Sequence, residues 1–377
     1  MNPGFSPACP ARHRHRQVVP VKLPVRCLEA AHRRRRQFKH FPARHEWRPA
    51  LTTVLTDRPG EIFGLTLGDD ERSVLHALVE RLTLTPPALV DDAGWLSLAR
   101  SASCQLPPRL TEAIRAFRHD PGSDGTLTIT NLPIAADRLP PTPTVPDSIE
   151  RATTVAATTA MLLGQQLGEV IAYRDEKHGA LVQNVIPVRS LATSQSNGGS
   201  VPLELHTENA FHPHRPDYVG LLCLRPAHQD RVGTQVAAIR HALPLLDDAD
   251  VTTLREARFI TEAPPSFRSA DASSPSAVLL GDAEDPDICV DFHATSALDD
   301  KAGRALDRLR EALVEVRTDL VLRPGDMVFV DNRLVVHGRV AFTPRYDGHD
   351  RWLHRVFVHL DNRRSRPSRP DNGPVLV

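Results

Sequence analysis

The chain has 377 residues and a balanced charge, with 46 Lys and Arg against 46 Asp and Glu. Residues 1–50 nevertheless hold 12 of the basic and only 2 of the acidic residues, so the rest of the chain carries 34 (46 − 12) against 44 (46 − 2). Five scattered cysteines without a CxxC pair argue against a disulfide framework or a structural zinc site. No apolar stretch resembles a transmembrane helix or a signal sequence, so a cytoplasmic protein without a membrane partner is expected.

Residues 1–50 are expected to form a basic tail rich in proline, arginine and histidine. Too few apolar residues occur in register to build a packed face, so the sequence predicts disorder there. The run Arg33–Arg36 has the charge to contact nucleic acid, but such runs are more often only solvated. A nucleic-acid partner is therefore not expected.

A single domain is expected from residue 51 to residue 362, followed by a C-terminal tail at 363–377. Its first helix has apolar residues between 74 and 82 at three- and four-residue steps, after Asp69 and Asp70, whose charges suit a helix N-terminus. The next predicted elements are a short helix at 110–117, a strand at 125–132, a proline-rich link at 139–146 and a helix that ends near 167. These helices are expected to form a jacket around the core.

From about residue 169 the pattern changes to short runs of strand-forming residues with turn residues between them. The predicted strands cover residues 169–173, 180–187, 202–206, 218–224, 234–238, 277–280, 288–292, 319–322, 327–330, 334–336 and 353–360. Such a series indicates a sandwich or barrel rather than a doubly wound parallel sheet. An amphipathic helix at 300–316 is expected to pack on the outside of a sheet, which makes the fold mainly β with flanking helices, an α+β class.

His206 and Glu208 are separated by one residue at the end of a predicted strand. Residues i and i+2 of a strand project from the same face, so this pair can bind one metal ion together. His337 would complete a set of two histidines and one carboxylate, which is typical of non-haem Fe(II) that also binds a co-substrate and O2. The same set occurs at catalytic zinc, so a zinc hydrolase stays open at this point.

Arg351 follows His337 by 14 residues (351 − 337). An iron enzyme that uses 2-oxoglutarate must hold this diacid at both ends. The 2-oxo acid end chelates the iron, and the far carboxylate needs a cation with paired donors, for which a guanidinium is well suited. Arg351 is predicted to supply that guanidinium.

Three segments carry a resemblance to a known family: HTENAFHPHRPDY at 206–218, DNRLVVHGR at 331–339 and RYDGHDRWLHR at 345–355. They resemble the clavaminate synthase-like branch of the Fe(II)/2-oxoglutarate oxygenases, which includes the free arginine and asparagine β-hydroxylases. The resemblance covers roughly residues 51–360 and leaves the basic tail outside. It implies a double-stranded β-helix, or jelly roll, at about 169–362, with the metal between its two sheets.

The resemblance also implies roles for matching residues. The metal and catalytic residues would be His206, Glu208 and His337, and Arg351 would anchor 2-oxoglutarate. Thr234 matches a threonine that hydrogen-bonds the co-substrate carboxylate, although a β-branched residue that fills a strand is the alternative. Arg355 matches a second arginine of the co-substrate pocket and, four residues after Arg351, shares its strand face.

The expected enzyme uses Fe(II), 2-oxoglutarate and O2 to hydroxylate an unactivated carbon, Cβ by preference, of a free or carrier-bound amino acid such as arginine. Specialised metabolite biosynthesis is the expected setting. The retained Glu208 disfavours chlorination, because halogenating relatives have a small residue there. Desaturation, cyclisation and a non-catalytic jelly-roll binding protein remain as alternatives.

The candidate substrate contacts come from polar residues near the metal motif. Gln183, and Ser194 and Ser196 in a predicted loop at 193–200, offer neutral donors and acceptors for an amino-acid head group. Arginine hydroxylases place a pair of acids, spaced by one residue, at the guanidinium, and the matching pair here is Asp291 and His293. The histidine puts arginine in doubt, so lysine, ornithine, asparagine, a modified arginine or a residue tethered to a carrier protein stay open.

Overall fold

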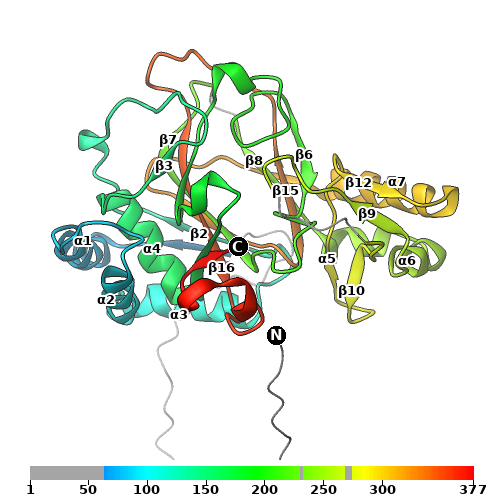
Figure 1. The fold of residues 1–377 in the computed structure, drawn as a ribbon, viewed down its shortest axis with the longest axis horizontal. Coiled ribbons are helices and arrows are strands. Elements are labelled where there is room, and N and C mark those ends of the chain that lie inside the picture. Colours follow the sequence, from blue (N-terminus) through cyan, green and yellow to red (C-terminus); the bar gives the residue numbers. More distant parts are fainter. Residues whose placement is uncertain (1–62, 230–231, 268–273) are drawn as a thin grey trace, which may run out of the picture. The chain divides into compact units, whose positions relative to one another are not determined.

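The computed structural model describes residues 63–229, 232–267 and 274–377, which belong to one compact unit (Figure 1). The expected basic tail at 1–50, together with the start of the expected domain, lies outside the described residues. None of the described helices has the combination of length and apolar composition that a membrane span requires.

The helices of the described residues are short and mostly capped by their own sequence. The α-helices are α1 (Asp69–Thr83), α2 (Ala93–Ser103), α3 (Pro108–His119), α4 (Val155–Leu167), α5 (Ile239–Ala242), α6 (Asp248–Leu254) and α7 (Asp300–Val316). The 3-10 turns are Ala136–Arg138, Lys177–Gly179, Arg189–Leu191, Leu243–Leu245, Arg366–Ser368 and Pro370–Asn372. Side chains of Asp92, Thr154 and Asp299 accept hydrogen bonds from backbone N–H groups in the first turns of α2, α4 and α7.

The strands are equally short. They are β1 (Phe63–Thr66), β2 (Thr126–Thr130), β3 (Ile149–Glu150), β4 (Glu169–Tyr173), β5 (Val182–Val185), β6 (Leu203–His206), β7 (Tyr218–Arg225), β8 (Thr234–Ala238), β9 (Phe259–Thr261), β10 (Leu279–Gly281), β11 (Pro286–Ile288), β12 (Thr295–Ala297), β13 (Thr318–Leu320), β14 (Met327–Asp331), β15 (Val335–Arg339), β16 (Trp352–His359) and β17 (Val375–Leu376). The strand predicted at 288–292 is misplaced, since β11 covers Pro286–Ile288 and only an isolated bridge between Asp291 and His206 follows it.

Two larger sheets build the core. One runs β1-β2-β14-β7-β16-β4-β17, with β5 beside β16 and β3 beside β5, and the other runs β13-β8-β15-β6. Two-stranded ladders, β10–β11 and β12–β9, complete the β structure of the described residues. The predicted jelly roll with flanking helices, an α+β fold, is confirmed.

The larger sheet is buried on both faces. On β7, Leu221 and Cys223 pack in the apolar cluster shared with the smaller sheet, while Leu222 and Leu224 pack in a second cluster with helices α1 to α4. A strand that is buried on both faces appears as a continuous apolar run, as β7 does in the sequence. Helices α1 to α4 therefore form the expected jacket on the outer face of this sheet, and α7 packs near β8 on the other side of the core (Figure 1).

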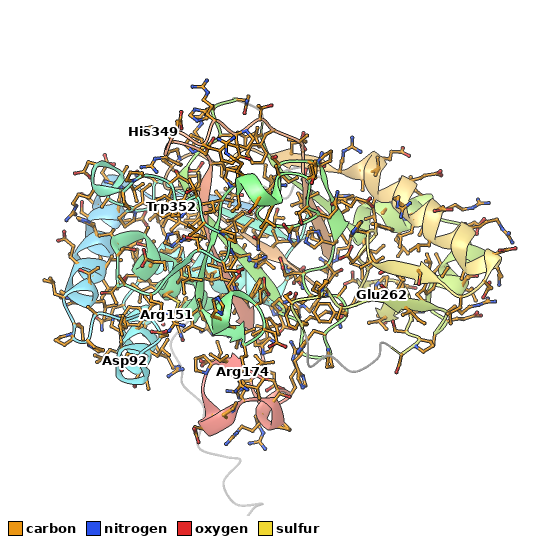
Figure 2. All side chains as sticks on the ribbon, turned by 45° about the horizontal axis from the view of Figure 1, so that its top comes forward. Asp92, Arg151, Arg174, Glu262, His349 and Trp352 are labelled. Carbon is orange, nitrogen blue, oxygen red and sulfur yellow. The ribbon has the colours of Figure 1, made fainter. Side chains whose placement is uncertain are left out.

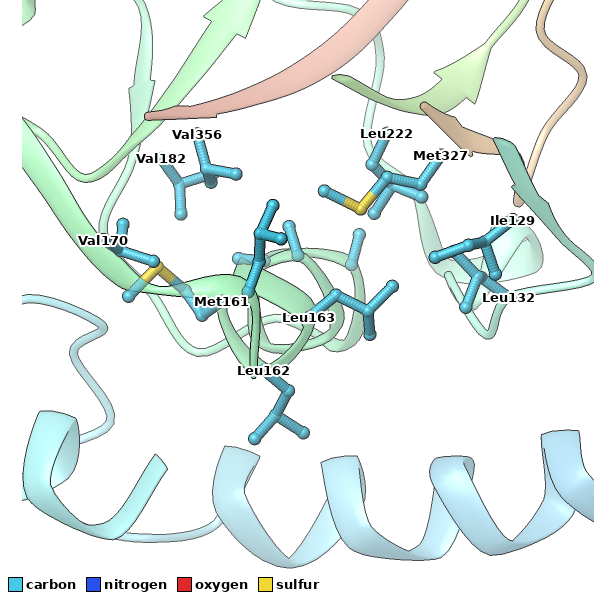
Figure 3. Close-up of a cluster of buried hydrophobic side chains, with 14 of the residues drawn as sticks. Ile129, Leu132, Met161, Leu162, Leu163, Val170, Val182, Leu222, Met327 and Val356 are labelled. Carbon is cyan, nitrogen blue, oxygen red and sulfur yellow. The ribbon is translucent and has the colours of Figure 1, made fainter. Parts of the chain in front are cut away.

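Helix α4 lies between the larger sheet and the outer helices. Figure 3 shows Leu162 pointing from α4 towards the flanking helices, whereas Leu163 points towards sheet residues such as Met327. Almost every α4 residue is buried, which explains its apolar composition all round.

Gly164 of α4 has no room for a side chain. A Cβ at this position would lie 2.8 Å from Val170 Cγ2, whereas a Cβ at Gly303 of α7 would have nothing within 4 Å. We expect Gly164→Ala to lower the free energy of unfolding by about 1–3 kcal/mol through overpacking. The matched Gly303→Ala should raise it by about 0.5–1 kcal/mol through helix propensity. Urea denaturation measures both, and equal effects would contradict this packing.

His354 of β16 is buried, and neither ring nitrogen has a hydrogen-bond partner among the described residues. Burial lowers the pKa of His354 to about 3. Because the unfolded histidine titrates near pH 6.5, the unfolded chain takes up the proton first, and stability is lost as the pH falls from about 6.5 towards 3. His354→Leu should make that loss shallower by up to about 1.4 kcal/mol per pH unit, measured by urea unfolding at a series of pH values. An unchanged pH dependence of the free energy of unfolding would show that His354 is not buried in its neutral form.

The last residues belong to the domain, contrary to the tail expected at 363–377. Strand β17 pairs in parallel with β4, Val375 opposite Ala172 and Leu376 opposite Tyr173. Arg369 is buried, and its guanidinium donates to the carbonyls of Asn362, Asn372 and Gly373. A two-residue strand has no periodicity to detect, and a segment rich in arginine, proline and serine looks like a tail in the sequence.

Candidate active site

A cavity of about 690 Å³ opens between the two larger sheets. Strands β6, β8, β15 and the start of β16 line it, together with residues 194–198 and 262–267. The structure brings six of the predicted site residues to its wall: His206, Glu208, Thr234, His337, Arg351 and Arg355. Their positions in the sequence span almost 150 residues (355 − 206 = 149), so the fold alone makes them neighbours.

The three predicted metal ligands converge. His337 on β15 lies opposite His206 on β6, and their ring centroids are 4.4 Å apart. His337 Nε2 lies 3.3 Å from Glu208 Oε2, and one candidate ligand atom from each of the three residues lies within 4.8 Å of the others. Gly338 allows this close approach, because a Cβ there would lie 2.5 Å from the Leu203 carbonyl oxygen of β6.

The protonation of these groups suits a divalent cation. His206 Nδ1 lies 2.9 Å from the carbonyl oxygen of Glu204, which can only accept, so Nδ1 carries a proton and Nε2 is the nitrogen whose lone pair a metal ion would use. Burial alone would raise the pKa of Glu208, but Arg355 and His337 outweigh it and hold the pKa below its ordinary value. Burial lowers the pKa of His337, which favours its neutral, metal-binding form. Two imidazoles and one carboxylate thus fit Fe(II).

Glu208 is held beyond the end of β6 by Asn332. The backbone N–H of Glu208 donates to Asn332 Oδ1 at 2.8 Å, and Asn332 Nδ2 donates to the Glu208 carbonyl at 3.1 Å. The extended path from His206 continues because Thr207 N–H donates to the Val290 carbonyl at 2.7 Å. The two predicted ligands therefore share a face as expected, although the regular strand stops at His206.

Arg355 contacts acids within the protein. Its Nη1 donates to Glu208 Oε1 at 2.9 Å, its Nη2 pairs with Glu176, and its Nε donates to Gln183 Oε1 at 3.1 Å. One oxygen of Glu208 is thereby fixed, and the other, Oε2, faces His337. Arg355 lines the cavity as predicted, but its charge is already shared by two carboxylates.

Arg351 differs from Arg355 in having no acidic partner within the part of the chain that the structure describes. It is 7% exposed, its Nη2 donates to Thr234 Oγ1 at 3.2 Å, and no carboxylate of the described residues lies within 4 Å of it. Burial lowers the pKa of Arg351 to about 10, so the guanidinium is charged at neutral pH. A buried charge without a counterion is costly, so this part of the cavity fits an anionic ligand such as the far carboxylate of 2-oxoglutarate.

The predicted substrate residues divide into two groups. Ser194, Ser196, Asp291 and His293 line the cavity, and the Ser196 hydroxyl is buried without a hydrogen-bond partner among the described residues. Asp291 Oδ1 accepts from the backbone N–H groups of His293 and Ala294, so only its other oxygen is open to a ligand.

The prediction for Gln183 as a substrate contact needs correction. Gln183 on β5 is 1% exposed and does not line the cavity, and its side-chain oxygen accepts a hydrogen bond from Arg355. Its neighbour Asn184 accepts a hydrogen bond from the indole of Trp352, labelled in Figure 2, at 2.7 Å. Both amides therefore support residues of β16 instead of facing a substrate.

Glu176 is a site residue that the sequence did not reveal. It lines the cavity, pairs with Arg355 and accepts from Asn209 Nδ2 at 3.2 Å. Burial is the largest influence and raises the pKa of Glu176, although Arg355 opposes it. Glu262, labelled in Figure 2, lines the same cavity after β9. Glu176 lies in a charged turn and Glu262 in a proline-containing loop, and both segments look like ordinary solvated connections in the sequence.

The site and fold match known proteins over most of the chain. The family model described as taurine catabolism dioxygenase TauD, TfdA family, matches residues 145–357. An L-asparagine oxygenase from Streptomyces coelicolor is 42% identical over 319 residues, which cover 84% of this chain and 96% of that protein.

Two solved structures also resemble this one. Asparagine oxygenase in complex with Fe(II), 2S,3S-3-hydroxyasparagine and succinate has a TM-score of 0.81 and 42% identity, over 83% of this chain and 99% of that chain. The non-heme iron oxygenase OrfP in complex with Fe and alpha-ketoglutaric acid has a TM-score of 0.77 and 31% identity, over 84% of this chain and all of that chain (100%).

Proposed function

Because the chain belongs to the TauD/TfdA family of dioxygenases, in its clavaminate synthase-like branch, we propose that it hydroxylates Cβ of a free polar α-amino acid, with asparagine as the first candidate. It is an Fe(II)- and 2-oxoglutarate-dependent amino-acid hydroxylase. One observation carries the proposal: a two-histidine, one-carboxylate cluster and a buried guanidinium without an acidic partner face the same cavity.

In this proposal the residues have separate tasks. Iron is held by His206, Glu208 and His337, and the far carboxylate of 2-oxoglutarate by Arg351 and Thr234. The main task of Arg355 is to orient the Glu208 carboxylate, and any contact with 2-oxoglutarate is secondary, because its donors already face Glu208 and Glu176. When bound, iron with 2-oxoglutarate and O2 supplies the oxidation, in which 2-oxoglutarate yields succinate and CO2 and one oxygen atom enters a C–H bond of the substrate.

The substrate would lie between the metal cluster and the cavity mouth. Glu176 is a buried acid on the cavity wall, and its carboxylate is suited to the α-ammonium group of the substrate. The Ser196 hydroxyl and the second oxygen of Asp291 can serve the polar side chain. The setting we propose is the cytoplasm, where free amino acids and 2-oxoglutarate occur together.

A second candidate substrate is an amino acid with a cationic side chain. The acids Glu204, Glu262 and Asp291 all line the cavity, and such a group of carboxylates would attract an ammonium or guanidinium. His293 in place of a second acid at the Asp291 turn favours the neutral side chain of asparagine over arginine.

Succinate release with a panel of free amino acids tests the proposed function. We expect O2-dependent succinate release with asparagine or a closely related polar amino acid, and a product that has gained one oxygen atom by mass spectrometry. A product that has instead lost two hydrogens would indicate desaturation. Turnover without O2, or no succinate with any member of the panel, would contradict the proposal.

A further inference from the structure

Arg339 is a second buried guanidinium on the wall of the cavity. It lies two residues after His337 on β15, is 4% exposed and lines the same cavity. In the pairing of β15 with β8, Arg339 lies opposite Thr234, the residue whose hydroxyl accepts from Arg351. Directly paired residues point to the same face of a sheet, so both guanidinium groups belong to the Thr234 end of the cavity.

The contacts of Arg339 leave part of its guanidinium unused. One Nη2 hydrogen bond goes to the Val201 carbonyl at 3.1 Å, and the guanidinium carbon lies 5.2 Å from the centre of the Phe342 ring. Nε is buried and has no hydrogen-bond partner among the described residues. An unsatisfied buried donor on a cation is costly, so a ligand that accepts from it is expected.

No acid of the described residues balances this charge. Among the described residues, no carboxylate lies within 4 Å of Arg339 or Arg351, and the nearby acids Glu208 and Glu176 pair with Arg355. The Thr234 end of the cavity therefore holds two buried cations that have no acidic partner among the described residues. A carboxylate has two oxygens with about four acceptor positions, enough for donors from two guanidinium groups.

We propose that Arg339 is a second positioning residue for the co-substrate, whose far carboxylate lies between Arg339 and Arg351. This arrangement rests on the proposed function and deepens it. It makes the cavity selective for 2-oxo acids with a second carboxylate, because a 2-oxo acid that ends in a methyl group would leave both cations without a counterion. The competing explanation is that Arg339 only braces the backbone at Val201 against Phe342.

Co-substrate binding by the Arg339→Gln variant distinguishes these explanations. The full-length protein loaded with Fe(II) is titrated without O2, by calorimetry, with 2-oxoglutarate and with 2-oxopentanoate, in which a methyl group replaces the far carboxylate. We expect Arg339→Gln to weaken 2-oxoglutarate binding at least about tenfold and to leave 2-oxopentanoate binding unchanged, since only a charged carboxylate uses the lost donor. The exposed Arg323→Gln is the matched control and should change neither.

Two results would overturn the proposal. Unchanged 2-oxoglutarate affinity would remove Arg339 from the site, and an equal loss for both ligands would indicate a structural brace. If Arg339→Gln does not fold, Arg339→Lys carries the test, because it keeps the charge and loses the fork, and a smaller loss confined to 2-oxoglutarate is expected. A wild-type protein that binds no 2-oxoglutarate would contradict the proposed function itself, and this outcome is distinct from a failure of the Arg339 proposal alone.

Discussion

Replacing His337 with alanine should reduce bound iron and O2-dependent succinate release to the level of the metal-free protein. His337 supplies one of three candidate ligands, and its Nε2 lies 3.3 Å from Glu208 Oε2. Without it, two ligands remain, and a facial site for a labile ion such as Fe(II) is incomplete. Iron content per chain and succinate release are the two measurements.

The control for this variant is His349→Ala. His349 is exposed on the loop before β16, is labelled in Figure 2 and does not line the cavity. It should keep wild-type iron and activity. Full iron occupancy in His337→Ala would remove His337 from the ligand set and with it the proposed centre.

Replacing Arg351 with alanine is expected to weaken 2-oxoglutarate binding by on the order of 2–5 kcal/mol, or roughly 30- to 4000-fold. The guanidinium is buried and has Thr234 as its hydrogen-bond partner, so the far carboxylate of the co-substrate would lose its fork of donors. Anaerobic titration of the Fe(II)-loaded protein measures the change. The 2-oxoglutarate affinity of Arg351→Lys should lie between that of the wild type and that of Arg351→Ala, because an ammonium keeps the charge but not the paired donors.

Unchanged co-substrate affinity in Arg351→Ala would contradict the anchor role. The exposed Arg323→Gln again serves as the control for a general loss of positive charge near the site. We expect Arg351→Ala to lose more 2-oxoglutarate affinity than Arg339→Gln, since Arg351 also contacts Thr234.

The jelly roll could be predicted because its strands have a strong local pattern. Strands such as β7 and β14 are apolar runs buried on both faces, and α1 and α7 have clear helical periodicity. Helix α2 was missed because its 11 residues are mostly small or apolar, and α5 and α6 because they span only 4 and 7 residues. Short elements owe their conformation to packing with the rest of the domain, which no local pattern reports.

The predicted ligand set converges as expected, whereas the substrate residues were only partly found. His206, Glu208 and His337 lie in segments that resemble a family motif, so spacing and resemblance both indicated them. The substrate contact predicted for Gln183 was wrong, because its position on β5 turns its side-chain amide towards Arg355. Glu176 was missed, because only the fold brings a charged turn after β4 beside Arg355, 179 residues later (355 − 176).

Anomalous diffraction from crystals grown without O2 in the presence of Fe(II) and 2-oxoglutarate tests the account most directly. The account predicts one iron peak within coordinating distance of His206, Glu208 and His337, with the co-substrate reaching from that peak towards Arg351. An iron peak elsewhere would contradict the account. So would the absence of a peak at this cluster in crystals of a protein preparation that is catalytically active in solution.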